Sequence, residues 1–257
     1  MVNEKYHGLG TAPSVIRELF AYGLQQAKVV GKENVFDYSL GNPSIPAPAK
    51  VNETIKKLID TTDSIQLHGY SMAPGFENVR QAIADNLNAR FNCNAKASEL
   101  FMTCGCAPAL VSVAHALTTS PEDEFIAIAP FFPEYNVFFT CAGAKLAVVP
   151  ADTVHFQIDM DALEKTINEH SVAVVINSPN NPSGVVYTEE TLTKIAELLE
   201  RKSKEYGHPI YIVADEPYRE LVYDGVKVTF IPNVYDNTIV CYSWSKSLSL
   251  PGERIGY

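Results

Sequence analysis

The sequence has little of what marks membrane-spanning, secreted or nucleic-acid-binding proteins. It contains no run of about eighteen apolar residues, which a membrane-spanning helix requires. Its first residues, MVNEKYHGLG, lack the basic segment followed by an apolar segment that a secretory signal shows. It has 20 Lys and Arg against 30 Asp and Glu, and the net charge of -10 repels a phosphate backbone. We therefore expect a cytoplasmic protein with no membrane and no nucleic-acid partner.

Cysteine is also scarce. Five cysteines, an odd number, fit reduced thiols better than a disulfide framework. Cys104 and Cys106 stand close together, but no second Cys/His pair at ligand spacing accompanies them. Ordinary small buried residues explain this pair better than ligands do, so we expect no bound metal.

What the chain does contain is a regular alternation of strand and helix patterns from about residue 99 onwards. Short apolar, β-branched runs end in turn residues, and helix-period segments follow them. The runs are ELFMT (99–103), EFIAIA (124–129), AKLAVV (144–149), SVAVVI (171–176), IYIVAD (210–215) and TIVCYS (238–243). Nearly continuous apolar strands alternating with helices indicate a parallel sheet covered on both faces. We therefore predict an α/β fold with three layers, αβα, and a mainly parallel sheet.

The segment ahead of this alternation has a different character. Its helical patterns span about 13–29, 47–61 and 75–92. The proline-rich link GNPSIPAP (41–48) cannot be helical throughout. We therefore predict two parts, with residues 1–45 as an amino-terminal arm or part of a small domain and residues 46–257 as a large domain.

The carboxyl ends of the predicted strands are the places to look for function, because ligands of open parallel sheets bind there. The groups that follow these ends are a glycine turn, an aromatic ring, an amide, a carboxylate, a phenol and a lysine. They belong to Gly105, Phe132, Asn181, Asp215, Tyr218 and Lys246.

This set suits pyridoxal phosphate, an aldehyde cofactor that needs a lysine for a Schiff base, a phosphate cradle, a stacking partner and an acid for its ring nitrogen. Lys246 can supply the amine, with a pKa lowered by desolvation. The Ser243 hydroxyl and the Arg254 guanidinium suit the phosphate, together with backbone N–H groups at a helix start. Those backbone groups belong to Gly105, Cys106 and Ala107.

The flat ring of the cofactor also has candidate partners. Phe132 can lie against it, although several aromatic residues crowd nearby and a core role is as reasonable. Asp215 can keep the ring nitrogen protonated, which makes the ring an electron sink. Asn181 and Tyr218 can donate to the phenolate oxygen, which lowers the pKa of the Schiff base.

Three motifs carry a family resemblance. NNPSG (180–184), DEPY (215–218) and SWSKSLSLPGER (243–254) resemble, in order and spacing, the class I/II aminotransferases, the fold type I pyridoxal-phosphate enzymes related to aspartate aminotransferase. The resemblance covers about residues 35–257. It implies transfer of an amino group from an amino acid to a 2-oxo acid, with Lys246 forming the Schiff base and then moving the proton.

The resemblance also implies the remaining site residues and the assembly. It places Ser243, Ser245 and Arg254 with the cofactor, and Gly41 and Asn181 with the substrate. Tyr70, five residues ahead of Gly75, matches a tyrosine that in the family reaches the phosphate of the neighbouring subunit. A homodimer with shared sites is therefore implied.

The sequence departs from the family in length. Family members continue past the lysine motif into a carboxy-terminal small domain that supplies an arginine for the substrate carboxylate. RIGY (254–257) looks like the start of the next strand. We therefore expect a truncated chain whose small domain is incomplete. A smaller departure is Trp244, where smaller side chains are more usual.

Two other functions stay open at this point. A carbon–sulfur lyase or a synthase shares this fold and these motifs. A ligand-sensing regulator can keep such a domain as a binding module, but it would need a DNA-binding segment. Residues 1–45 show neither a helix-turn-helix pattern nor basic charge.

Overall fold

The computed structural model describes residues 2–39 and 41–257, and the chain divides into two units whose boundary in the sequence falls between Ile45 and Pro46. The first unit contains α1 (Glu4–Thr11), α2 (Val15–Val30) and the short 3-10 helix η1 (Lys32–Asn34). The same position separates the two predicted parts. The assignment of the first part as an arm or as part of a small domain stays a prediction.

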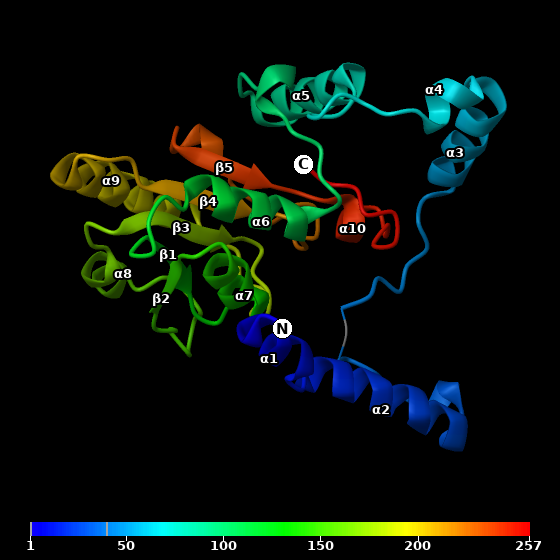
Figure 1. The fold of residues 1–257 in the computed structure, drawn as a ribbon, viewed down its shortest axis with the longest axis horizontal. Helices are drawn as coiled ribbons and strands as arrows, with labels where there is room; N and C mark the ends of the chain where they lie inside the picture. Colours follow the sequence, from blue (N-terminus) through cyan, green and yellow to red (C-terminus); the bar gives the residue numbers. More distant parts are fainter. Residues whose placement is uncertain (1, 40) are drawn as a thin grey trace. The chain divides into compact units, whose positions relative to one another are not determined.

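The second unit contains a sheet and the remaining helices (Figure 1). Its helices, with short 3-10 turns marked η, are α3 (Ala49–Thr61), α4 (Ser64–His68), α5 (Glu77–Phe91), η2 (Ala97–Glu99), α6 (Cys106–Leu117), α7 (Glu134–Cys141), α8 (Met160–Thr166), α9 (Glu189–Tyr206), η3 (Ile231–Asn233) and α10 (Trp244–Ser247). Its strands are β1 (Glu124–Ile128), β2 (Lys145–Val149), β3 (Ser171–Asn177), β4 (Tyr211–Asp215) and β5 (Thr238–Cys241).

The five strands form one parallel sheet in the order β2-β1-β3-β4-β5. Five of the six apolar runs therefore become strands within one or two residues of the predicted bounds. The register brings Asn177 beside Asp215 and Asp215 beside Cys241, at the carboxyl edge of the sheet. The loops that leave this edge carry most of the candidate residues.

The run ELFMT is not a strand, so that prediction is wrong. Leu100 closes the 3-10 turn η2, and the Met102 N–H donates to the carbonyl of Pro74 instead of to a sheet strand. Thr103 alone forms a bridge, antiparallel to Gly256. An apolar β-branched run thus predicts extended backbone, whereas membership of the sheet depends on which segment lies alongside.

Helices cover both faces of the sheet, which confirms the three-layer αβα fold. Alternate side chains along each strand point to opposite faces. Ile126, Val174 and Ile212 pack in one buried core with residues of α8 and α9. Phe125, Val175 and Val213 pack in another with residues of α6 and α7. Figure 1 shows these two pairs of helices on either side of the strands.

The longest helix, α9, illustrates why the sequence pattern works. The Thr188 side chain accepts the N–H of Thr191 and caps the helix start, and Gly207 ends the helix with a φ of 77°. The leucines and isoleucine at helical spacing are buried against the sheet. None of the helices that the structure describes combines the length and the apolar character needed to cross a bilayer.

Candidate active site

Asp215 ends strand β4 and is the centre of the candidate site. Its side chain is buried, and it accepts two hydrogen bonds: one from Cys106 Sγ to Oδ1 at 2.9 Å and one from the Tyr135 hydroxyl to Oδ2 at 2.5 Å. Burial raises the pKa of the Asp215 carboxyl, and these two hydrogen bonds oppose that rise. The carboxyl group is thus fixed at both oxygens by donors from α6 and α7.

Asn177 braces the same corner from the neighbouring strand. Its Nδ2 donates to the backbone carbonyl of Asp215 at 2.7 Å, and its Oδ1 accepts the N–H of Asn181 at 2.6 Å. The end of β4 and the loop after β3 are therefore tied together by one buried amide. This contact places Asn181, a predicted site residue, at the carboxyl edge beside Asp215.

The NNPSG loop is held from within. The Asn180 carbonyl accepts the N–H of Gly184 at 2.8 Å, and Asn180 Oδ1 accepts the N–H and the hydroxyl of Ser183. Asn180 is buried and Asn181 half-buried, so the loop holds its second asparagine where a ligand can reach it. Tyr218, in the turn after β4, is also half-buried, and burial followed by the charge of Asp215 raises the pKa of its hydroxyl.

The start of α6 forms a small-residue cradle. Gly105 has a φ of 98°, and a Cβ at this position would lie 2.6 Å from Nη2 of Arg254. The Arg254 guanidinium therefore rests against the glycine backbone, directly ahead of Cys106 and Ala107. The first N–H groups of a helix have no partner within it and carry partial positive charge. A guanidinium and a helix start are both groups that can bind an anion such as a phosphate.

The turn after β5 carries the lysine. Ser243 and Ser245 are buried, Ser243 bridges to Gly256, and Lys246 lies on the short helix α10. Lys246 is half-buried, and this burial lowers the pKa of its amine. A lowered amine pKa increases the fraction of the neutral, nucleophilic form at neutral pH.

Phe132 contacts this centre through Tyr135. The two rings meet edge to face, with centroids 5.7 Å apart. Because Tyr135 donates to Asp215, Phe132 lies one side chain away from the carboxylate. The Phe132 ring is half-buried, and its stacking on the cofactor stays a prediction.

The two remaining predicted residues are Tyr70 and Gly41. Tyr70 follows α4 and is fully exposed. Gly41 lies in the first unit and is exposed. Their proposed contacts with a neighbouring subunit and with substrate stay predictions.

Cys104 and Cys106 lie in different environments. Cys104 is exposed, whereas the Cys106 thiol is buried against Asp215. Within residues 2–39 and 41–257, no group of three or more His, Cys, Asp or Glu side chains is arranged to hold a metal ion.

Beside the site, a buried ion pair anchors the turn that carries Tyr218. Glu216 and Arg219 form a salt bridge with both side chains 2% exposed. The Arg219 guanidinium also lies over the rings of Phe91 and Tyr242, at 5.3 and 4.6 Å, and donates to the Tyr257 hydroxyl at 3.3 Å. This pair fixes the residues immediately after Asp215.

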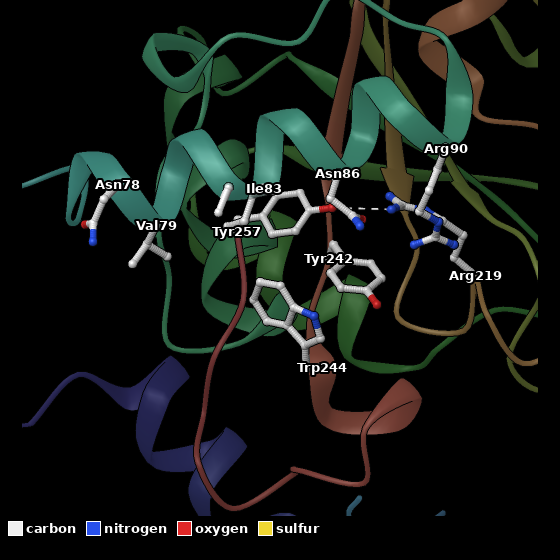
Figure 2. A pocket seen from close by; sticks show the side chains of 10 residues that line it. Asn78, Val79, Ile83, Asn86, Arg90, Arg219, Tyr242, Trp244 and Tyr257 are labelled. Atoms are coloured by element: carbon white, nitrogen blue, oxygen red, sulfur yellow. Dashed lines mark hydrogen bonds between the residues drawn. The ribbon is translucent and has the colours of Figure 1, made fainter. Parts of the chain in front are cut away.

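Arg219 also borders a hollow of about 470 Å³ between α5 and the residues that follow β5. Figure 2 shows Tyr242, Trp244 and Tyr257 gathered below α5, with Arg219 bonded to the Tyr257 hydroxyl. None of the candidate cofactor residues lines this hollow. Trp244 is accommodated here by edge-to-face packing on Tyr242 and tilted packing on Tyr257.

Sequence reasoning missed Tyr135, Asn177 and Arg219. Tyr135 and Phe139 stand four apart on α7 and are both buried, and a buried tyrosine hydroxyl normally has a partner. Asn177 is a polar residue that continues a buried strand. These signals predict that each polar group has a buried partner, although they do not name it.

Comparison with known proteins shows which family the chain belongs to. A family model, aminotransferase class I and II, matches residues 33–257. The chain belongs to this family. The resemblance read from the three motifs is therefore confirmed.

Individual relatives of this aminotransferase-family chain support the same conclusion. A probable N-acetyl-LL-diaminopimelate aminotransferase of Bacillus subtilis is 31% identical over 94% of this chain and 59% of its own length. A crystal structure of an aminotransferase from Eubacterium rectale is 61% identical, with a TM-score of 0.98, over 100% of this chain and 65% of that one. The aspartate aminotransferase of Thermus thermophilus, 24% identical with a TM-score of 0.84, shares the fold over 63% of its chain. The chain thus spans about three fifths of the length of the curated relatives it matches.

The residues present fit pyridoxal phosphate. A Cβ on Gly105 would occupy the space against the Arg254 guanidinium, so the cradle depends on a residue without a side chain. Asp215 is a buried carboxyl aligned by two donors, and Lys246 is a half-buried amine of lowered pKa. An anion site, a fixed carboxylate and a reactive amine are the groups that this cofactor requires.

Proposed function

We propose that this chain carries the cofactor-binding part of a pyridoxal-phosphate-dependent aminotransferase that uses Lys246 as its Schiff-base lysine. One continuous set of contacts supports this function. Arg254 rests against Gly105, and Cys106 follows Gly105 in the chain. The Cys106 thiol donates a hydrogen bond to Asp215. The anion cradle and the acidic partner of the ring nitrogen are therefore joined through two adjacent residues.

Each residue has a definite task in this proposal. Arg254, Ser243 and the N–H groups at the start of α6 would hold the phosphate. Asp215 would keep the ring nitrogen protonated, and Asn181 and Tyr218 would donate to the phenolate oxygen. When bound, the cofactor supplies an electron sink for the substrate α-carbon.

Lys246 has two tasks. Its Nζ would hold the cofactor covalently in the resting state, and after release it would move the proton between the reacting carbons. Half-burial on α10 favours both, since the neutral amine is needed at each stage. Ser245, which precedes Lys246 in the chain and is buried, would limit the access of water. Phe132, which packs on Tyr135, would confine the cofactor ring.

Substrates and assembly belong to the same proposal. The family resemblance supports an amino acid and a 2-oxo acid as substrates, bound near Gly41 and Asn181. It also supports a homodimer in which Tyr70 reaches the partner's phosphate. The full exposure of Tyr70 is compatible with such a contact.

Borohydride reduction of the cofactor-supplied chain, followed by peptide mass mapping, tests the function. We expect a pyridoxyl label on Lys246, no label in Lys246→Ala, and normal labelling in the exposed control Lys227→Ala. An unlabelled Lys246 peptide from folded protein would contradict the proposal. Comparing 2-oxo-acid-dependent amino transfer with release of pyruvate and ammonia then separates an aminotransferase from a lyase.

A further inference from the structure

The Cys106 thiol forms a hydrogen bond with Asp215 and is not needed for the proposed phosphate cradle. The cradle at the start of α6 uses backbone groups, whereas the Cys106 side chain is turned to Asp215 Oδ1 at 2.9 Å. Asp215 Oδ2 is held from the other side by the Tyr135 hydroxyl at 2.5 Å. Each carboxylate oxygen therefore accepts one hydrogen bond, and the two donors come from different helices.

We propose that Cys106 is a positioning residue of this site, and that its thiol, together with the Tyr135 hydroxyl, fixes the Asp215 carboxylate in one orientation and in the ionised state. A carboxylate offers roughly four acceptor positions. Two are used by these donors, which leaves others for a ring N–H. The contact between Asp215 and a ring N–H rests on the proposed function, because the proposed cofactor supplies the ring nitrogen.

The surroundings of Asp215 explain why two neutral donors are needed. Burial raises the pKa of its carboxyl group, and the hydrogen bonds from Cys106 and Tyr135 act in the opposite direction. Its own carbonyl is also fixed, by Asn177 Nδ2. The carboxylate is thus ordered before any ligand binds, so no reorganisation is required when the ring arrives.

The other titratable groups near Asp215 do not replace these donors. They are Cys241 on β5 and, in the turn after β4, Glu216 and Tyr218. Burial raises the pKa of Cys241 and of Tyr218, so both stay neutral at neutral pH, and Glu216 is paired with Arg219. Burial likewise raises the pKa of the Cys106 thiol and the Tyr135 hydroxyl, which keeps both as donors.

Infrared spectroscopy of the cofactor-free 257-residue chain tests the hydrogen bond directly, since thiol stretching falls in a window without other protein bands. The Cys106 band is identified by its loss in Cys106→Ala. We expect it to move to higher frequency in Asp215→Asn, because an amide oxygen is a weaker acceptor than a carboxylate. Cys93, whose thiol donates to Asn88 Oδ1 at 3.3 Å, is the matched control and should not move.

The effect on charge is read from the carboxyl bands of Asp215, identified as those lost in Asp215→Asn. We expect Cys106→Ala and Tyr135→Phe each to shift the titration of this carboxyl to higher pH by about one unit, since a hydrogen bond to the charged form is lost. Cys106→Ser, which keeps a donor, should restore the wild-type midpoint. A merely structural role for the thiol would not show this rescue.

Supplying pyridoxal phosphate then separates this inference from the function on which it rests. We expect the dissociation constant of the cofactor to rise several-fold in Cys106→Ala and to recover in Cys106→Ser. An unmoved Cys106 thiol band and an unshifted Asp215 titration in the variants would overturn the inference even if Lys246 is labelled. Failure to label Lys246 in the wild-type chain, with the infrared shifts present, would overturn the proposed function and leave the Cys106–Asp215 bond established. If Cys106→Ala does not fold, Cys106→Ser identifies the thiol band, and Cys106→Val, which lacks a donor, replaces Cys106→Ala in the titration and in the cofactor measurement.

Discussion

Nη2 of Arg254 lies 2.6 Å from the position that a Cβ on Gly105 would occupy, so the guanidinium rests on bare backbone. Gly105 has a φ of 98° and a ψ of 176°, a conformation reached almost only by glycine. Arg254 itself has a φ of 53°. Both sides of the proposed phosphate cradle thus depend on backbone conformations that few residues adopt.

Gly105→Ala should therefore damage the cradle as well as the fold. The backbone strain is expected to lower the free energy of unfolding by about 1–3 kcal/mol. The new methyl group would also push the Arg254 guanidinium aside and should weaken cofactor binding at least tenfold. Urea unfolding and a cofactor titration measure the two effects.

Gly143→Ala is the matched control for this substitution. Gly143 has a φ of 99°, but nothing lies within 4 Å of its hypothetical Cβ. We expect a similar loss of stability with unchanged cofactor affinity. Equal losses of affinity in the two variants would show that strain, and not the Arg254 contact, controls binding.

Asn177→Ala should uncouple Asp215 from the NNPSG loop. It removes the partner of the Asp215 carbonyl and of the Asn181 N–H, and leaving buried polar groups without partners costs about 1–3 kcal/mol each. Cofactor affinity should fall too, because Asn181 loses its anchor. Asn88→Ala is the control, since Asn88 also binds two backbone groups, at Ala95, but far along the chain from Asp215. Unaltered cofactor affinity in Asn177→Ala would rule out this brace.

Arg219→Met should be strongly destabilising, because it leaves the buried Glu216 carboxylate without its partner. We expect a loss of about 3–5 kcal/mol in the free energy of unfolding. The exposed pair between Lys194 and Glu190 gives the comparison, since Lys194→Met should cost less than about 1 kcal/mol.

The pH dependence of Arg219→Met has a definite sign. Burial raises the pKa of Glu216, and Arg219 opposes that rise. Without Arg219 the folded chain keeps this proton at pH values where the unfolded chain has lost it, so stability should fall as pH rises above the ordinary value of 4.5. Urea unfolding at several pH values from 4.5 upward measures the slope, and a flat profile would contradict the assignment.

The amine of Lys246 predicts a second pH effect. Its pKa lies below the ordinary value of 10.5 because the side chain is half-buried. Cofactor attachment should therefore reach half its maximum at a lower pH than attachment to N-acetyl-lysine amide. In the window between the two pKa values the unfolded chain binds more protons, so stability rises with pH, and Lys246→Met should flatten that rise. Identical attachment profiles for the protein and the model amine would refute the lowered pKa.

Much of the fold follows from local pattern. Five apolar runs became the parallel strands, and Thr188 and Gly207 cap the two ends of α9. The strand prediction for ELFMT failed because an extended, apolar sequence does not specify which strand it will pair with. Its outcome depended on Pro74 and Gly256, which lie far from each other in the sequence.

By itself the sequence determined the layered α/β fold and the family, and it named the candidate reactive groups, because strand and helix periods and motif spacing are local properties. Tertiary structure alone decided that the Cys106 side chain bonds Asp215, that Tyr135 holds the second oxygen, and that Asn177 links two loops. A buried polar group must find a partner, but the partner is chosen by the way helices cross the sheet edge. That choice involves residues up to 109 positions apart, which no local pattern records.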